Sequence, residues 1–349
     1  MSNNFVNIVG YQLEKVHTGV ISWILDTENK TVSLQIKFEI IRRIYKMCNK
    51  AIDFQLNEIK NINCFPEYSF GRKRKIDLVI KIDLFNSTPR YLVIEMKVDS
   101  IPTSDQLQGT QFDFNQKNVS DQNNVLFLLF LFGSAQVCEQ PELYNFNLFR
   151  LPWILEVFAG FPIEEYIYKD WIASLENENL RKIHIKSELE NAPEIWDDSY
   201  WKKKRYRTWF PLFYYIYHEL KCHSKRFEEW DIYSGQNNPV MNWRNGCLHK
   251  DILGHPIKFY WEFNYEDFVL KAMIDEHNKL SHDDLNWLRD EVGTICHHET
   301  HYGRKTQYRY GTYNSLYKWE FDFKNQDITF IMKKVDEILD KIHPILTLL

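Results

Sequence analysis

The sequence predicts an α/β protein built around a mixed β-sheet in its N-terminal part, and three observations lead to this class. Two apolar strand-like runs, 76–82 and 91–98, flank a turn at Asn86 to Thr88 that Pro89 closes, which is typical of a β-hairpin. A helix-start signal follows at 102–106, and the apolar run 125–132 comes next, with the length of a buried strand. A hairpin, a crossover helix and a returning strand make residues 77–132 one folding unit with a mixed sheet.

Two helices are predicted before the hairpin. Apolar residues recur at helical spacing over 12–25 and again over 33–50, where Ser33 is a suitable N-cap. A short strand is predicted over 54–59, followed by a loop around Pro66.

The character of the chain changes after residue 160, where aromatic residues become dense and charges are mixed among them. We expect helices near 163–176, 208–221, 265–279 and 327–342, and strands near 256–263 and 317–323. The predicted organisation is therefore a core at 1–160 and a mixed, helix-rich region at 161–349 that selects a substrate or serves as an accessory part.

Composition limits the broad class. The hydrophobic content of 44% is typical of a globular protein, and the formal net charge of −5 argues against a wholly basic, histone-like binder. The six cysteines form no C-x-x-C pair, which gives no sign of a zinc ribbon or redox motif. The N-terminus lacks a signal-peptide pattern and the longest apolar run is too short for a bilayer, so we expect a cytoplasmic protein with no membrane contact.

The hairpin carries three side chains that can act together on a phosphodiester. Side chains alternate between the faces of a strand, so Glu95 and Lys97 share one face of the second strand. Pairing of the strands puts Asp77 opposite a position close to Met96, with its carboxylate near that of Glu95. Two carboxylates repel unless a cation lies between them, and Mg²⁺ binds one or two carboxylates together with water and phosphate.

This stretch resembles the PD-(D/E)XK nuclease superfamily. The resemblance rests on Ile76-Asp77, Glu95-Met96-Lys97 and the Gln106-Leu107 pair that opens the next helix, and upstream on segments 14–17 and 22–26. It covers about the first 140 residues and implies a restriction-endonuclease-like core of αβββαβ order. Two departures stand out: Ile76 replaces the proline of the motif, and Thr110 stands where the exonuclease-type extension has tyrosine, which argues against a processive exonuclease.

The resemblance implies roles for particular residues. Asp77, Glu95 and the Met96 carbonyl would hold Mg²⁺, with Mn²⁺ as the alternative ion, and Lys97 would stabilise charge at the reacting phosphate. Gln106 would lie beside that phosphate; the other interpretation is that it only completes a capping box with Thr103. A first-helix acid would reach the metal, with Glu14 as first candidate and Glu39 as second; the alternative for Glu14 is an ordinary exposed helix acid.

Three basic clusters also contain or adjoin aromatic residues, a combination that suits phosphate contact and base stacking. We favour nucleic-acid contact for the first two and leave the third, 302–310, open. The predicted nucleic-acid-binding residues are Arg72, Lys73, Arg74, Lys75, Lys202, Lys203, Lys204, Arg205 and Arg207. Each cluster has a solvated surface run as its alternative interpretation.

The segment His297 to His301 resembles a zinc motif only superficially. The metalloprotease pattern H-E-x-x-H needs two residues between its glutamate and second histidine, and this segment has one. We therefore favour a structural role for it.

The leading functional hypothesis is a metal-dependent DNA nuclease whose context, by resemblance, is bacterial restriction or anti-phage defence. The alternatives are a nuclease-derived domain that binds nucleic acid or a protein partner without cleaving, and a nuclease that acts on RNA. Cleavage of paired strands would suit a homodimer.

Overall fold

The computed structural model describes residues 4–69, 75–98, 102, 104–118, 124–133, 143–191, 193–203, 210–234, 238–274, 280–306 and 310–348. These residues form two compact units that divide between Pro211 and Leu212. We call them the N-terminal unit and the C-terminal unit.

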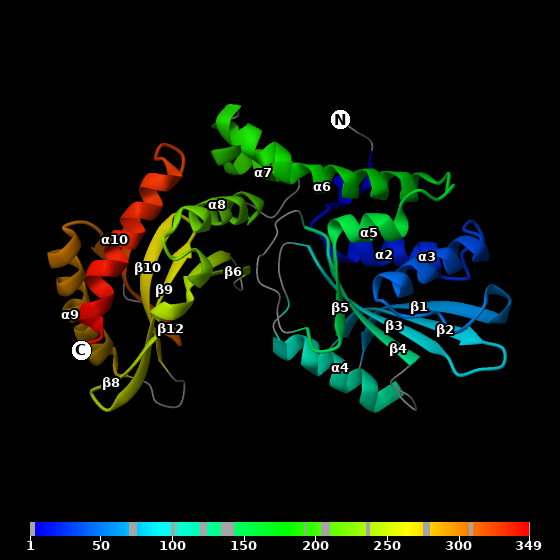
Figure 1. Cartoon of the computed structure of the whole chain (residues 1–349), viewed down its shortest axis with the longest axis horizontal. Helices are drawn as coiled ribbons and strands as arrows, with labels where there is room; N and C mark the ends of the chain where they lie inside the picture. The colour runs from blue at the N-terminus through cyan, green and yellow to red at the C-terminus, as the bar shows by residue number, and fades with distance from the viewer. Residues whose placement is uncertain are drawn as a thin grey trace. The chain divides into compact units, whose positions relative to one another are not determined.

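A five-stranded mixed sheet forms the centre of the N-terminal unit, in the order β1-β2-β3-β4-β5 (Figure 1). The first three strands pair antiparallel, whereas β3, β4 and β5 pair parallel to one another. The strands are β1 (Ile59–Ser69), β2 (Lys75–Leu84), β3 (Arg90–Lys97), β4 (Val125–Leu131) and β5 (Phe146–Arg150). The predicted hairpin, crossover helix and buried strand are thus confirmed, with β5 as an additional parallel strand.

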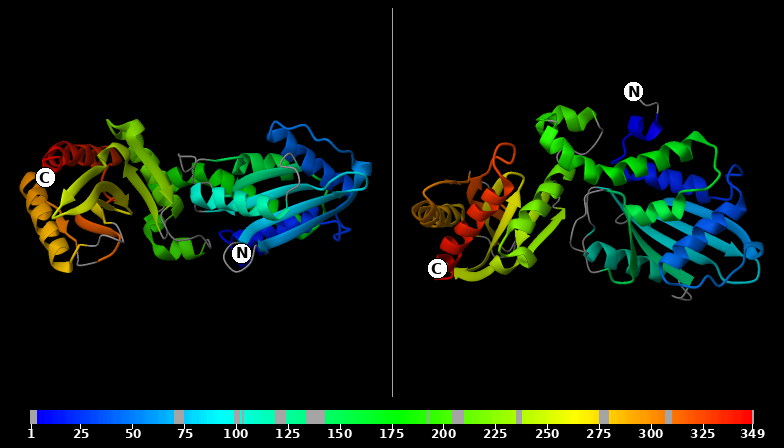
Figure 2. Two further views of the ribbon diagram at one scale, coloured as in Figure 1. Left: turned by 90° about the horizontal axis from the view of Figure 1, so that it is seen from below. Right: turned by 45° about the horizontal axis from the view of Figure 1, so that its top comes forward.

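Helices cover both faces of this sheet (Figures 1 and 2). Helix α4 covers one face, where Leu107 and Phe114 pack with Val79, Val93 and Phe127. The other face, with Ile80, Leu92 and Ile94, packs in one cluster with residues of α2, α3, α5 and α6. The helices are α1 (Phe5–Val9), α2 (Glu14–Leu25), α3 (Leu34–Met47), α4 (Ser104–Asn118), α5 (Leu151–Phe158), α6 (Tyr166–Asn191) and α7 (Asp198–Lys203).

The N-terminal unit extends well beyond residue 160, where the sequence analysis divided the chain. The side chain of Asp170 on α6 accepts the Phe5 N–H at 2.9 Å, and the Trp171 indole N–H donates to His17 on α2 at 3.1 Å. These contacts attach α6 to the start of the chain, so the compact unit ends near 211. The functional assignment of the two parts stays a prediction.

The predicted strand over 54–59 is wrong. Residues Leu56–Glu58 form a 3-10 turn, and β1 begins only at Ile59 and continues through Pro66, where a loop was expected. Proline lacks the N–H that a central strand needs, but β1 is an edge strand of the sheet and tolerates it.

The C-terminal unit contains a seven-stranded antiparallel sheet in the order β11-β12-β10-β9-β7-β6, with β8 paired to β9. Its strands are β6 (Trp230–Ser234), β7 (Pro239–Trp243), β8 (Leu248–Ile252), β9 (His255–Asn264), β10 (Asp267–Ile274), β11 (Arg304–Lys305) and β12 (Tyr313–Glu320). Its helices are α8 (Phe210–His223), α9 (His282–Thr300) and α10 (Ile328–Leu346). Buried aromatic rings, among them Trp261, Phe268 and Trp319, form its core.

The predicted helix at 265–279 is wrong over its described part, where Asp267–Ile274 forms β10. The pair Asn264↔Asp267 leaves two residues for a tight turn, and Tyr265 has the left-handed φ of 55° that such a turn requires. Phe268, Leu270 and Ala272 alternate into the core with a period of two, so the apolar pattern was read at the wrong period.

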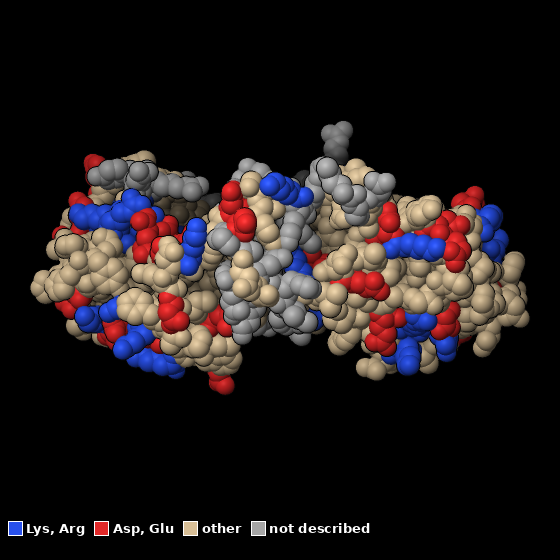
Figure 3. Space-filling model, turned by 90° about the horizontal axis from the view of Figure 1, so that it is seen from above, with Lys and Arg blue, Asp and Glu red and all other residues tan. Residues whose placement is uncertain are grey.

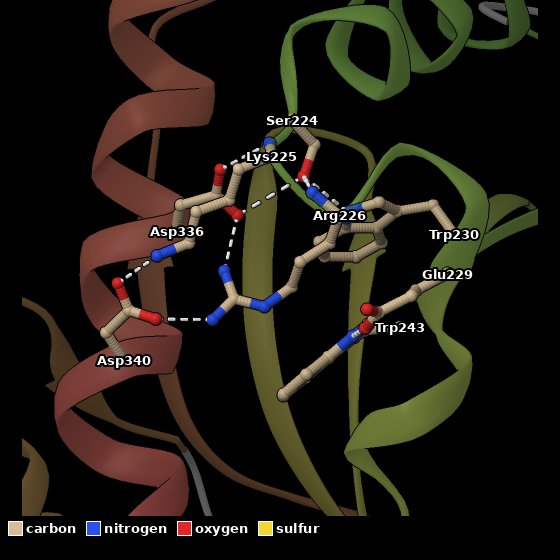
Figure 4. Close-up of polar contacts among 8 residues, drawn as sticks. All are labelled: Ser224, Lys225, Arg226, Glu229, Trp230, Trp243, Asp336 and Asp340. Carbon is tan, nitrogen blue, oxygen red and sulfur yellow. Dashed lines mark hydrogen bonds and ion pairs between the residues drawn. The ribbon is translucent and has the colours of Figure 1, made fainter.

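A polar network fixes the turn after α8 against α10 (Figure 4). The buried Asp336 carboxylate accepts hydrogen bonds from Ser224 Oγ at 3.2 Å, Lys225 N at 3.0 Å and Arg226 Nη1 at 2.8 Å. Asp340, one helical turn later, binds Lys225 and Arg226 as well. Charge-assisted hydrogen bonds thus hold residues 224–226 against α10.

The described helices include none whose length and apolar character would let it cross a membrane. Acidic and basic side chains are interspersed over the face shown in Figure 3. On this face, attraction of a charged partner would therefore depend on local clusters of charge.

Candidate active site

Strand register brings Asp77 beside Glu95. The ladder of β2 and β3 ends at Leu78↔Ile94, and its continuation by one residue puts Asp77 opposite Glu95, one position from the predicted place. Beyond the last pair, the Asp77 carboxylate replaces a backbone acceptor, since the Met96 N–H donates to its Oδ2 at 2.8 Å. This bond fixes the carboxylate at the end of the hairpin.

Lys97 lies at the centre of three carboxylates. Its Nζ is 3.2 Å from Glu95 Oε1, 3.6 Å from Asp77 Oδ2 and 3.5 Å from Glu14 Oε1, and it donates to the Met96 carbonyl at 2.7 Å. Glu14 comes from the first turn of α2, so a helix and two strands supply the cluster. We call Glu14, Asp77, Glu95 and Lys97 the acidic cluster.

Burial gives the acidic cluster unusual protonation behaviour. Desolvation raises the pKa of Glu95 to about 7, against the lowering effect of Lys97. Burial also raises the pKa of Glu14, again opposed by Lys97. For Lys97, burial alone would lower the pKa, but the neighbouring carboxylates outweigh it and raise the pKa above its ordinary value. Lys97 is thus held as a cation, while Glu95 is poised to exchange a proton near neutral pH.

Gln106 joins the cluster from α4. Its side-chain amide donates to Glu95 Oε1, the same oxygen that faces Lys97. The second oxygen, Glu95 Oε2, is buried and has no hydrogen-bond partner among the described residues. A buried carboxylate oxygen without a donor is costly and fits a cation as its missing partner. Thr103, the other half of the predicted capping box, lies outside the described residues.

The residues present fit an open metal site rather than a closed protein cage. Over the described ranges, no group of three or more His, Cys, Asp or Glu side chains could hold a metal ion, and within the acidic cluster the Lys97 ammonium lies among the carboxylates. Mg²⁺ commonly keeps several waters and takes only one or two protein carboxylates. Asp77 and the partnerless oxygen of Glu95, with the nearby Met96 carbonyl, match that donor set.

Glu39, the second candidate for the first acid, does not join the acidic cluster. Its carboxylate accepts from Arg42 Nε at 2.7 Å and lies 3.6 Å from Arg43, both on its own helix α3. Among the two candidates, the described structure therefore favours Glu14.

His17 acts as a structural link close to the acidic cluster. Its Nδ1 accepts from Trp171, so its Nε2 donates to the Tyr11 carbonyl at 2.8 Å. The Tyr11 hydroxyl donates to the Phe132 carbonyl at 2.7 Å, and the Phe132 N–H donates to the Lys97 carbonyl at 2.8 Å. Burial lowers the pKa of His17 to about 4, so its ring is neutral. This hydrogen-bond chain connects α6 to the backbone of Lys97.

The basic clusters fall mostly outside the described residues. This applies to Arg72, Lys73, Arg74, Lys204, Arg205 and Arg207. Lys75 opens β2 and its side chain is exposed; Lys202 and Lys203 end helix α7, and Lys203 is exposed. Their contact with nucleic acid stays a prediction.

The segment His297 to His301 is the end of α9 rather than a loop. The helix continues to Thr300, and His301 caps it with a left-handed φ of 60°. His298 faces Glu299 at 2.9 Å, whereas His297 lies 3.4 Å from the Tyr317 hydroxyl. No metal-binding group that includes these histidines is found among the described residues, and their structural role stays a prediction.

Comparison with known proteins adds one finding to this geometry. A family model described as the PD-(D/E)XK nuclease superfamily matches residues 3–226, which is more than half of the chain and includes every member of the acidic cluster. No curated protein and no solved structure matches the chain. The mixed sheet, the order of its elements and the matched region agree, and the chain belongs to the PD-(D/E)XK nuclease superfamily.

Proposed function

We propose that the protein is a metal-dependent nuclease that hydrolyses phosphodiester bonds in DNA. The observation that carries this proposal is the convergence of Asp77, Glu95 and Lys97 at the end of one hairpin, with a buried Glu95 oxygen that has no donor among the described residues. Membership of a nuclease superfamily supports it.

The metal, Mg²⁺ or alternatively Mn²⁺, would be held by Asp77, Glu95 and the Met96 carbonyl. When bound, it supplies Lewis-acid polarisation of the phosphate and lowers the pKa of a bound water. The chain's own contribution is to place charge. Lys97, kept protonated by the carboxylates around it, orients the attacking water and stabilises negative charge on the phosphate.

Gln106 and Glu14 complete the proposed site from two directions. Gln106 holds one Glu95 oxygen, and the other oxygen, which has no hydrogen-bond partner among the described residues, would be available to a cation. Glu14 balances the charge of Lys97 and would complete the shell of the cation from the side of α2. Hydrolysis in this arrangement would leave a 5′-phosphate, as the superfamily resemblance implies.

We further propose a cytoplasmic role in bacterial restriction or anti-phage defence, with a homodimer as the form that would cut paired strands. These finer assignments rest on the family resemblance and on the predicted basic clusters.

A plasmid-nicking assay tests the proposal. Purified protein is incubated with supercoiled DNA in Mg²⁺, in Mn²⁺ and in EDTA, and in parallel with single-stranded RNA. We expect nicking of DNA in either metal, none in EDTA, and loss of nicking in Lys97→Ala.

Asp83→Asn provides a matched control, because Asp83 lies on the same strand as Asp77 but pairs with Lys81 at 2.7 Å and accepts from Asn63 at 3.0 Å, away from the cluster. This control should cut DNA like the wild type. Full activity in a folded Lys97→Ala protein would remove the proposed site, whereas cleavage of RNA alone would correct the substrate.

A further inference from the structure

Two lysines share one glutamate beside the acidic cluster. Lys15 Nζ lies 2.9 Å from Glu67 Oε1, and Lys75 Nζ lies 3.6 Å from Glu67 Oε2. The three side chains come from α2, β2 and β1, and all are exposed, with side-chain exposures of 79% for Lys15, 61% for Lys75 and 47% for Glu67. We call them the lysine clamp.

The chain places the lysine clamp directly beside the acidic cluster. Lys15 follows Glu14 in the first turn of α2, and Lys75 precedes Asp77 by two residues on β2. The pairs Pro66↔Leu78 and Tyr68↔Ile76 flank Glu67, so continuous register puts Glu67 opposite Asp77. Lys15 is therefore next to Glu14 along helix α2, and Lys75 lies two residues from Asp77 on the same face of β2.

Glu67 is held in an uncommon backbone conformation. Its φ is 49°, in the left-handed region that few non-glycine residues adopt, and such positions are frequent at functional sites. The hydrogen bond and charge of Lys15, followed by the charge of Lys75, lower the pKa of Glu67, so its side chain is an anion at neutral pH. The Glu67 carboxylate thus occupies the position beside the two lysines that the oxygens of a phosphate could occupy.

An exposed ion pair is easily exchanged for another. Pairs of this kind contribute little to stability, because water screens both charges. A backbone phosphate brings a full negative charge, and its neutralisation by lysine releases condensed counterions from the nucleic acid. Counterion release therefore favours binding of the two lysines to a nucleic acid over their pairing with Glu67.

We propose that Lys15 and Lys75 bind a backbone phosphate of the substrate next to the phosphate at the acidic cluster, and that Glu67 occupies their ammonium groups until the nucleic acid displaces it. The proposal rests on the proposed function in that the substrate is a nucleic acid. It assigns a phosphate subsite to Lys15 and a competing, binding-weakening role to Glu67.

The test measures binding without cleavage, with a fluorescein-labelled DNA duplex titrated by fluorescence anisotropy in EDTA, between about 50 and 200 mM salt. Lys15→Ala should weaken binding and lower the slope of log K against log salt by about 0.9. Glu67→Gln should strengthen binding severalfold, because the lysines lose their resident anion. This gain should shrink in the double variant Lys15→Ala/Glu67→Gln, since Glu67 acts through Lys15.

Lys30→Ala is the matched control. Lys30 is also exposed, but it follows the opposite end of α2 and donates to the Thr27 carbonyl at 2.6 Å. Its removal should leave the affinity and the salt slope unchanged. Thermal melting by circular dichroism checks that every variant is folded.

Unchanged binding in Lys15→Ala, or weaker binding in Glu67→Gln, would overturn the lysine clamp, as would a wild-type protein with no affinity for the duplex. The two proposals can fail separately. Duplex binding that depends on Lys15 without any nicking in Mg²⁺ would contradict the nuclease function only, whereas nicking with Lys15-independent binding would contradict the clamp only.

Discussion

The ammonium of Lys97 lies 3.5 Å from the carboxylate of Glu14, and this contact joins strand β3 to the first turn of helix α2. Because the same ammonium also faces Asp77 and Glu95, the charge of one lysine balances acids from three elements. The acidic cluster is therefore coupled, and changes at one member should alter the behaviour of the others.

Two substitutions can separate the hydrogen-bonding role of Asp77 from its proposed role in catalysis. Asp77→Asn keeps an oxygen acceptor for the Met96 N–H but removes the charge, so we expect nicking to fall about 100-fold or more with stability within about 0.5 kcal/mol of wild type. Asp77→Ala also leaves that N–H without its acceptor and should cost a further 1 kcal/mol, roughly. Plasmid nicking and urea denaturation measure the two effects. Equal stability of both variants would contradict the hydrogen-bonding role.

Glu95 should make the metal-free protein less stable as the pH rises. Its pKa is about 7 in the folded protein against an ordinary 4.5, so the folded state binds the proton more tightly than the unfolded state. Its stabilising contribution is present below about pH 4.5 and is lost as the pH rises to about 7, on the order of 3 kcal/mol in total. Urea denaturation in EDTA across this pH range should show that the free energy of unfolding decreases less in Glu95→Gln than in wild type. Parallel curves for the two proteins would refute the shift.

His17 should act in the opposite direction. Its folded pKa is about 4 against an ordinary 6.5, so its contribution is complete above pH 6.5 and is lost as the pH falls toward 4. His17→Gln removes this titration, and its unfolding free energy should fall less steeply on acidification than that of wild type, by about 3 kcal/mol over the window. Because Glu95 and His17 titrate in overlapping ranges, only the differences between variant and wild type separate them. A variant as sensitive to acid as wild type would contradict a buried neutral ring.

Lys97 should stabilise the protein when no divalent ion is present. Lys97→Met leaves three carboxylates without their central cation, two of them substantially desolvated, and we expect a loss of about 3 kcal/mol in EDTA. Mg²⁺ should restore more stability to this variant than it adds to wild type, because binding to the folded state alone stabilises that state. Thermal melting with and without Mg²⁺ measures both effects.

Lys81→Met is the control for this prediction, since Lys81 pairs with the single carboxylate of Asp83, and both side chains are only half-buried on β2. It should lose no more than about 1 kcal/mol and gain no additional response to Mg²⁺. Equal Mg²⁺ responses in Lys97→Met and Lys81→Met would contradict the role of Lys97 as the internal cation.

The fold and the acidic cluster were largely predictable because their signals are local. Strand parity and one hairpin turn bring Asp77 to Glu95 and Lys97, and a single amphipathic helix presents Glu14. Lys75 was among the predicted nucleic-acid-binding residues, but Lys15 and Glu67 were missed, because Glu67 meets the two lysines only through the pairing of β1 with β2 and the packing of α2 beside them, which no spacing in the sequence encodes. Helix α9 was missed although Ser281, which accepts the Asp284 N–H, is followed by two acids that are typical of a helix start.

The wrong helix at 265–279 has a different cause. Short apolar segments fit both the helical and the strand period, and tertiary pairing decides between them. Residues 267–274 form a strand because β9 and β12 pair with them on both sides. The sequence of these residues alone does not indicate this pairing.

Arg226 is the last residue of the matched family region, yet its guanidinium is held by Asp336 and Asp340 near the other end of the chain. The inherited sequence module thus ends inside a unit that a much later helix completes. A fusion protein that contains only the first 226 residues would leave Arg226 without its carboxylate partners on α10. It would also expose apolar surface that α10 covers in the full chain. Chimaeras built from this protein should be joined near residue 211 instead, where the chain passes from one unit to the other.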